Sequence, residues 1–113
     1  MDVQLVYFDE CPNWRLAQER LREALTTIGR DDVHIQLRMV THPADAQGAG
    51  LHGSPTILVN GTDPFPRPDG DVWSCRLYRN ENGLEGAPSV AALVDVLRRA
   101  ASGHRGTMEA EQR

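Results

Sequence analysis

The stretch VQLVYFDECPNW, residues 3–14, decides the fold because it joins an apolar strand to the start of a helix and places a cysteine at the junction. Apolar residues fall at both parities from Val3 to Phe8, which is typical of a strand that is buried on both faces. Cys11 and Pro12 follow, and Pro12 suits the first turn of a helix because its missing N–H is not needed there. The sequence therefore predicts a thiol at the amino end of a helix.

The next two segments extend this start into a β-α-β unit. Apolar side chains recur every three or four residues from Trp14 to Ile28, polar side chains fill the other face, and Gly29 follows as a helix stop. Residues 33–40 alternate between apolar and polar side chains, which indicates a half-exposed strand at or near a sheet edge. A strand, a helix and a strand of these lengths predict a right-handed parallel unit.

The second half of the chain predicts two more strands and two more helices. Residues 43–51 predict a short helix, residues 56–59 an apolar strand, and residues 74–78 a strand antiparallel to it, beyond a proline-rich excursion over residues 62–73. Ser89 suits the N-cap of a closing helix. We therefore predict one domain, residues 1–101, followed by a disordered C-terminal tail, residues 102–113. The predicted fold is α/β, a four-stranded mixed sheet in the order β-α-β-α-β-β-α with helices packed on both faces.

Composition narrows the classes of function. The chain has 113 residues and a net charge of −4, and all of its cationic side chains other than histidine are arginines. It has no basic cluster with interleaved aromatics, so a nucleic-acid partner is not expected. No apolar run approaches the ~20 residues that cross a bilayer, and the chain starts directly as a strand, so we expect a cytoplasmic protein without a membrane partner. The absence of lysine excludes Schiff-base chemistry.

The two cysteines, Cys11 and Cys75, carry the chemistry that the sequence suggests. Unpaired N–H groups and the helix dipole favour an anion such as a thiolate at the position of Cys11. Asp9 and Glu10 precede it and oppose this effect. The histidines and cysteines lack the paired spacing of a structural zinc site, so no resident metal is predicted. We expect no other cofactor.

Residues 3–99 resemble the thioredoxin-fold superfamily. The residues that carry the resemblance are CPNW at 11–14, after the first strand, and GSPT at 53–56, before the third. The resemblance implies a thioredoxin-like fold in which Cys11 is the nucleophile and Pro55 is a cis-proline opposite it. Ser54 would be the neighbour whose backbone hydrogen-bonds the bound partner, and Pro12 and Trp14 complete the predicted substrate-binding residues. Trp14 replaces the second cysteine of Cys-x-x-Cys, so the usual dithiol cycle is excluded.

A narrower resemblance concerns Cys75, which lies in WSCR at residues 73–76. A cysteine there either approaches Cys11 across the end of the sheet or is an inert core residue. The placement of Cys11 and Cys75 is similar to the core of the organomercurial (alkylmercury) lyases, which cleave a carbon–mercury bond. Those enzymes carry an acidic residue three positions after the first cysteine, where this chain has Trp14. Capture of a soft metal ion by two thiolates does not need that acid.

Three functions follow from these features. The leading hypothesis is a possible enzyme, a thiol oxidoreductase in which Cys11 reacts with a small thiol or a protein disulfide and Cys75 or an external thiol resolves the adduct. The first alternative is binding of a soft metal or organomercurial by Cys11 and Cys75. The second is a non-catalytic binding scaffold. The half-exposed strand at residues 33–40 is also able to pair with a second copy of the chain, so a homodimer belongs to the expected partners.

Overall fold

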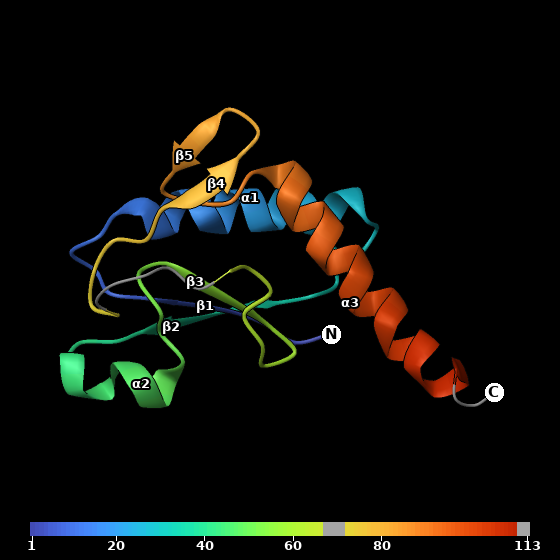
Figure 1. Ribbon diagram of the computed structural model, residues 1–113, viewed down its shortest axis with the longest axis horizontal. Coiled ribbons are helices and arrows are strands. Elements are labelled where there is room, and N and C mark those ends of the chain that lie inside the picture. The colour runs from blue at the N-terminus through green and yellow to red at the C-terminus, as the bar shows by residue number, and fades with distance from the viewer. Residues whose placement is uncertain (67–71, 111–113) are drawn as a thin grey trace.

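A three-stranded mixed sheet forms the centre of the computed structural model, which describes residues 1–66 and 72–110, with side chains through residue 102. The central strand β1 (Val3–Tyr7) runs parallel to β2 (Ile35–Met39) and antiparallel to β3 (Thr56–Val59) (Figure 1). Four of the five residues of β1 are buried, whereas β2 lies at the sheet edge and is largely exposed. The predicted parallel unit and the predicted edge strand are both confirmed.

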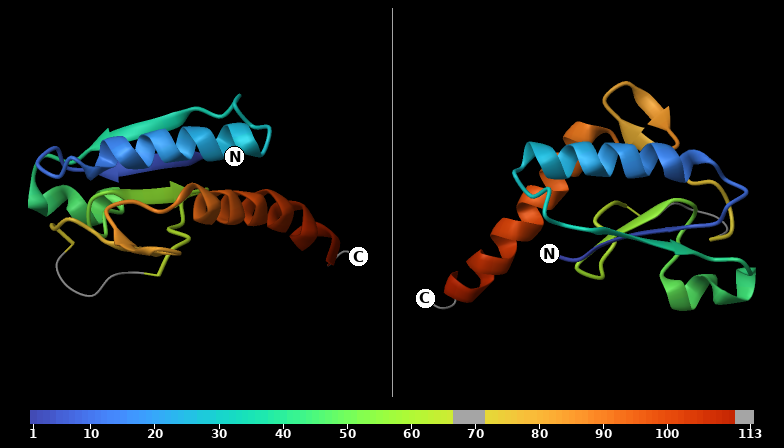
Figure 2. Two further views of the ribbon diagram at one scale, coloured as in Figure 1. Left: turned by 90° about the horizontal axis from the view of Figure 1, so that it is seen from above. Right: turned by 180° about the vertical axis from the view of Figure 1, so that it is seen from behind.

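Two helices cover one face of this sheet. α1 (Asn13–Thr27) follows β1, and α3 (Val90–Ala110) closes the described chain and packs against α1. Figures 1 and 2 show both helices on the same side of the strands, with the C-terminal half of α3 projecting beyond them. The larger aliphatic core lies between these layers, and its largest fully buried side chains are Val3, Leu5, Leu21, Ile57, Leu93 and Leu97.

A smaller core lies on the opposite face. There the chain forms a 3-10 turn, η1 (Pro43–Asp45), and the short helix α2 (Ala46–Ala49), as expected for residues 43–51. Trp73 stacks on Phe8 with the ring centroids 4.4 Å apart. The buried members of this second core are Val6, Phe8, Cys11, Val40, Ala46, Ala49, Leu51 and Leu58. Cys11 is therefore part of a packed apolar cluster.

The prediction of a four-stranded sheet is wrong. Among the described residues, only three strands form the central sheet, and β4 (Tyr78–Asn80) pairs with β5 (Gly83–Glu85) in a separate two-stranded sheet. Cys75 makes a single parallel bridge to Ser54, not an antiparallel ladder with β3. At the C-terminal end of β3, the chain turns back and pairs with the strand. The backbone N–H of Val59 donates to the carbonyl oxygen of Thr62 across a tight turn. The thioredoxin-like sheet expected from the sequence is therefore not formed by these residues.

The β4–β5 hairpin is fastened to α1 by one arginine. Arg20 donates to both carboxylate oxygens of Glu85 at 3.3 Å and to the carbonyl oxygens of Ala87 and Pro88. Hydrogen bonds from Arg20 and then from Asn80 hold the pKa of the Glu85 carboxyl below its ordinary value. Figure 1 shows the hairpin beside α1, away from the central sheet.

The closing helix begins at the predicted N-cap. The Ser89 hydroxyl accepts from the backbone N–H of Ala92 at 3.1 Å, which confirms the predicted N-cap. α3 continues to Ala110, and the disordered tail expected over residues 102–113 stays a prediction. Residues 111–113 lie outside the described part of the chain. None of the helices in residues 1–66 and 72–110 combines the length and the apolar composition that crossing a membrane requires.

A buried ion pair holds the excursion after β3. The Arg76 side chain is 1 % exposed and donates to the Asp63 side chain, which is 4 % exposed, with Nη1 2.7 Å from Oδ2. Arg76 also donates to the Pro66 carbonyl oxygen and lies over the Tyr78 ring, 4.5 Å from its centroid. Gly53 has φ +89°, and a Cβ there would come within 2.9 Å of the Arg76 Cβ, so a side chain at position 53 is excluded on both grounds.

Replacing Asp63 with asparagine tests this ion pair. Asp63→Asn leaves the Arg76 charge buried without its counter-charge, and breaking a buried pair in this way costs about 3–5 kcal/mol. We expect the free energy of unfolding from urea titration to fall by that amount. Asp95→Asn, which removes an exposed i, i+4 pair with Arg99, is the matched control and should leave the midpoint close to wild type. Equal effects of the two substitutions would contradict a structural role for the buried pair.

Candidate functional site

Cys11 and Cys75 form a disulfide that joins positions 64 residues apart. Their Cα atoms are 5.9 Å apart, within the range that disulfides span. Of the two alternatives that the sequence left open for Cys75, the structure shows the one in which this thiol reaches Cys11. The described residues thus contain no free cysteine.

The backbone of Ser54 positions Cys75. The Ser54 N–H donates to the Ser74 carbonyl oxygen at 2.8 Å, and the Arg76 N–H donates to the Ser54 carbonyl oxygen at 2.9 Å. The Ser54 hydroxyl accepts from the Phe8 N–H at 3.2 Å, so the same residue also fastens the end of β1. Ser54 therefore joins the two chain segments that carry the sulfurs.

The bond between Ser54 and Pro55 is cis, as the resemblance implied. Both residues are fully buried, and the Tyr78 hydroxyl donates to the Pro55 carbonyl oxygen at 2.5 Å. Burial raises the pKa of Tyr78, which keeps this hydroxyl a donor. In this disulfide form the backbone groups of Ser54, which were expected to face a partner, are paired with the chain's own residues 74 and 76.

Cys11 lies just before α1 in the second apolar core, and its sulfur has two polar neighbours there. Its side chain is fully covered, and Sγ lies 3.5 Å from the Ser54 carbonyl oxygen. The Asn13 side-chain amide points at the same sulfur from the first turn of α1, with Nδ2 at 3.8 Å, and acts as a weak donor. A Cβ on Gly86 would overlap the Asn13 side chain, so the glycine leaves the space that this amide occupies. The sequence reasoning missed Asn13 and Gly86, although Asn13 stands inside the motif at residues 11–14.

The other predicted substrate-binding residues differ in their placement. Pro12 is exposed next to Cys11 and is the N-cap of α1. Trp14 is half-buried, stacks on Tyr7 with the ring centroids 4.2 Å apart, and packs against the core under α1 and α3. Cys11 belongs to the core on the opposite face. The structure thus places Trp14 in the packing of α1 and not in the cluster around the disulfide.

The two cysteines differ sharply in exposure. Cys11 is 0 % exposed, whereas Cys75 is exposed. Around Cys75 the chain alternates, because Arg76 and Tyr78 point inward while Leu77 is 57 % exposed. The disulfide therefore has one sulfur in a packed interior and the other on a residue that solvent reaches.

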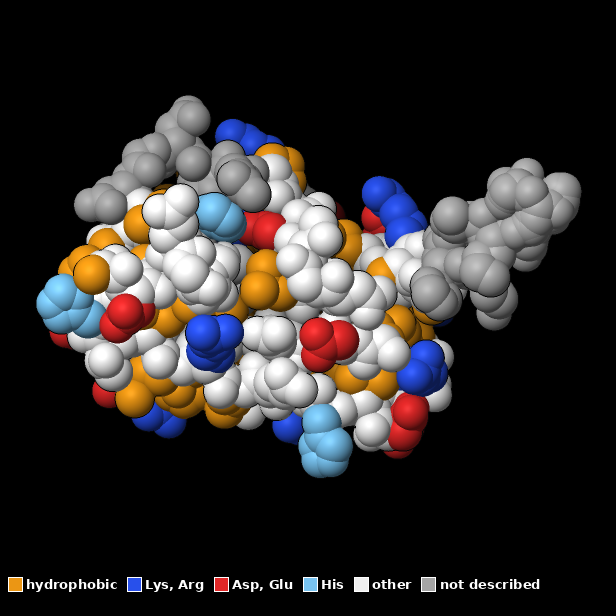
Figure 3. All heavy atoms as spheres, turned by 90° about the horizontal axis from the view of Figure 1, so that it is seen from below, with side chains coloured by type: hydrophobic (Ala, Val, Ile, Leu, Met, Phe, Trp, Pro, Cys, Tyr) orange, Lys and Arg blue, Asp and Glu red, His pale blue; other side chains and the backbone are white. Residues whose placement is uncertain are grey.

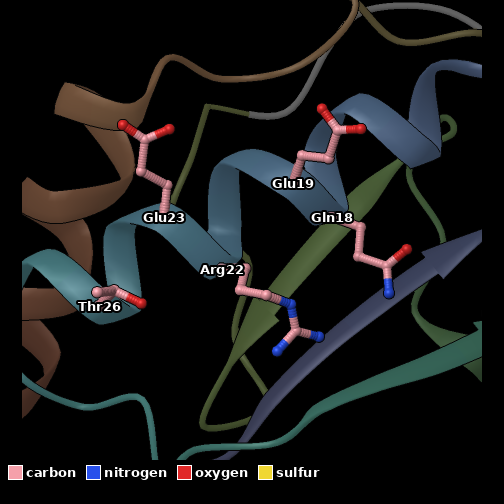
Figure 4. A pocket seen from close by; sticks show the side chains of 5 residues that line it. All are labelled: Gln18, Glu19, Arg22, Glu23 and Thr26. Carbon is pink, nitrogen blue, oxygen red and sulfur yellow. The ribbon is translucent and has the colours of Figure 1, made fainter.

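Other candidate sites are weaker. Among the side chains that the structure describes in residues 1–66 and 72–102, no three His, Cys, Asp or Glu residues are grouped so that they could hold a metal ion. A hollow of about 470 Å³ lies on α1. Its described lining residues all come from that helix, and their side chains point in different directions (Figure 4). Figure 3 shows acidic and basic side chains scattered singly over the α2 face rather than gathered into one charged patch. The disulfide and its neighbours are the best-organised chemical group that the structure describes.

Comparisons with known proteins found no match to a family model, a curated protein or a solved structure. What the site does must be inferred from its own geometry.

Reduction of the disulfide should destabilise the protein measurably. A bond that closes a loop of this length restricts the unfolded chain, and disulfides typically contribute about 2–4 kcal/mol. We expect a reductant to lower the urea midpoint of the wild type accordingly. Cys75→Ser should start near the lower value and show no further response to reductant. A wild type whose midpoint ignores the reductant would contradict the bond between Cys11 and Cys75.

Proposed function

We propose that this chain is a thiol–disulfide exchange protein whose working group is the Cys11–Cys75 pair. The observation that carries the proposal is the disulfide itself, which joins the two cysteines of the sequence at the start of a helix. One of its residues is exposed, and exposed disulfides are typically the labile, regulatory or catalytic ones.

The reaction needs only thiols as partners. A partner thiolate attacks one sulfur of the pair, a mixed disulfide forms, and the other cysteine leaves as a thiolate. A second partner thiolate then attacks the partner sulfur of the mixed disulfide. The partner leaves as a disulfide, and the protein has gained two electrons and two protons. Small thiols and protein dithiols are the expected partners, and in the reverse direction the reduced pair reduces a disulfide.

The reduced form keeps the two thiols close together. Residues 74–76 are held by backbone pairing with Ser54, and Arg76 is held by Asp63, and neither interaction involves the sulfurs. Opening the bond therefore leaves the segment that carries Cys75 attached beside Cys11, ready for reoxidation. A cytoplasmic location, which stays a prediction, would place this pair in contact with the thiol pools that reduce disulfides.

The same adjacency supports soft-metal or organomercurial binding as a second candidate. Two thiolates on Cα atoms 5.9 Å apart form a ready chelate for a soft ion once the disulfide is reduced. We propose binding without carbon–mercury cleavage here, because the position of the proton-donating acid holds Trp14. Two measurements distinguish the candidates. Exchange turnover without metal supports the first candidate, and tight binding of mercuric ion by the reduced protein without such turnover supports the second.

Substitution of either cysteine tests the exchange function. We expect Cys11→Ser and Cys75→Ser each to lower turnover at least a hundredfold in an assay that couples glutathione to reduction of hydroxyethyl disulfide, because each removes half of the redox group. Leu84→Ser, which changes an exposed residue on the separate hairpin, is the control and should keep wild-type turnover. Unchanged rates in both cysteine variants would remove the proposal.

A further inference from the structure

We propose that an incoming thiolate attacks Cys75 and that Cys11 is the sulfur released. This assignment rests on the exchange function proposed above. It gives the two cysteines the opposite order from the one expected from the sequence, in which Cys11 meets the partner first.

Access favours Cys75. Thiol–disulfide exchange depends on which sulfur a thiolate reaches, and Cys75 is exposed while Cys11 is completely covered. Ser74 and Leu77, which flank this position in the chain, are exposed as well, so solvent reaches the segment that carries Cys75. Arg76, on the other side, is buried against Asp63.

The geometry of displacement disfavours attack on Cys11. A thiolate that displaces a sulfur approaches along the line of the S–S bond, from the side opposite the leaving sulfur. For Cys11 the surroundings are the second core, in which Phe8, Leu51 and Leu58 are buried together with it. A partner would have to enter that packed cluster before reacting.

The surroundings of Cys11 suit the leaving sulfur. The Asn13 amide, 3.8 Å from Sγ, is positioned to donate to a released thiolate, and Cys11 stands at the amino end of a helix of 15 residues, where a negative charge is favoured. The Ser54 carbonyl oxygen, 3.5 Å away, can accept from the thiol once it is protonated. Asn13 is thus a positioning residue for the released group.

The step balances without another reactant. The bond between the Sγ atoms of Cys11 and Cys75 breaks, and its electron pair stays on Cys11. A new bond forms between the partner sulfur and Cys75, and a proton from solvent later neutralises the Cys11 thiolate. In the reverse direction Cys75 attacks the partner disulfide and Cys11 resolves the adduct.

The site of the first adduct tests this order directly. Oxidised wild-type protein is mixed with reduced glutathione, quenched with acid before reduction is complete, alkylated with N-ethylmaleimide and cleaved with trypsin. Cys11 and Cys75 fall in different peptides, residues 1–15 and 39–76, because trypsin does not cut between Arg67 and Pro68. We expect glutathione on peptide 39–76 in at least tenfold excess over peptide 1–15, with N-ethylmaleimide on Cys11.

The outcomes separate this inference from the exchange function. Glutathione on peptide 1–15 in equal or greater amount overturns the assignment of Cys75 and leaves the exchange function standing. A disulfide that survives excess glutathione with no adduct on either peptide overturns both.

Single-cysteine variants give a second measurement that does not depend on trapping the adduct. Cys11→Ser leaves Cys75, and Cys75→Ser leaves Cys11, for reaction with dithiobisnitrobenzoate. We expect the first variant to react at least tenfold faster than the second when folded, and at a similar rate in guanidinium chloride, where burial is lost. A folded Cys75→Ser variant that reacts as fast as Cys11→Ser overturns the assignment.

Discussion

The pairing of Ser54 with residues 74–76 decides where the second sulfur lies. Cys75 is 64 residues from Cys11, and chain proximity alone would not bring them together. Two backbone hydrogen bonds, one from each neighbour of Cys75, fix its register against Ser54. The Ser54 hydroxyl accepts from the Phe8 N–H and so holds the end of β1 that leads into Cys11. The disulfide is therefore formed between segments that hydrogen bonds already hold side by side.

The same register also places a charge inside the protein. Side chains alternate along an extended segment, so Cys75 and its neighbour Arg76 point to opposite sides of the chain, and Arg76 is the buried one. Asp63 meets that charge, and Gly53 leaves the space that the Arg76 side chain needs. A slip of one residue would expose Arg76 and bury Cys75. The buried ion pair is weak grounds for net stability, but it opposes this slip, because the slip would leave Asp63 unpaired.

The sequence predicted the parts of this structure that depend on local pattern. A continuous apolar run identified β1, helical spacing identified α1, and alternation identified the edge strand β2. The resemblance carried in part by the motif at residues 53–56 implied the cis bond before Pro55. The prediction of a fourth strand in the central sheet was wrong because the pattern at residues 74–78 indicates an extended segment. It does not show which strand edge that segment pairs with. The burial of Cys11 could not be predicted either, because the core to which it belongs includes Leu51 and Leu58, which only tertiary packing brings near the start of α1.

A sulfur buried among apolar side chains must still be accommodated in each state through which it cycles. An unpaired polar group costs free energy in such surroundings, and a charged one costs more. Cys11 has one acceptor, the Ser54 carbonyl oxygen, and one donor, the Asn13 amide, within reach of Sγ. The carbonyl serves the neutral thiol and the amide serves the thiolate, so neither form is left without a partner when the bond to Cys75 opens. This pair of contacts allows a fully covered cysteine to act as the released half of an exposed disulfide.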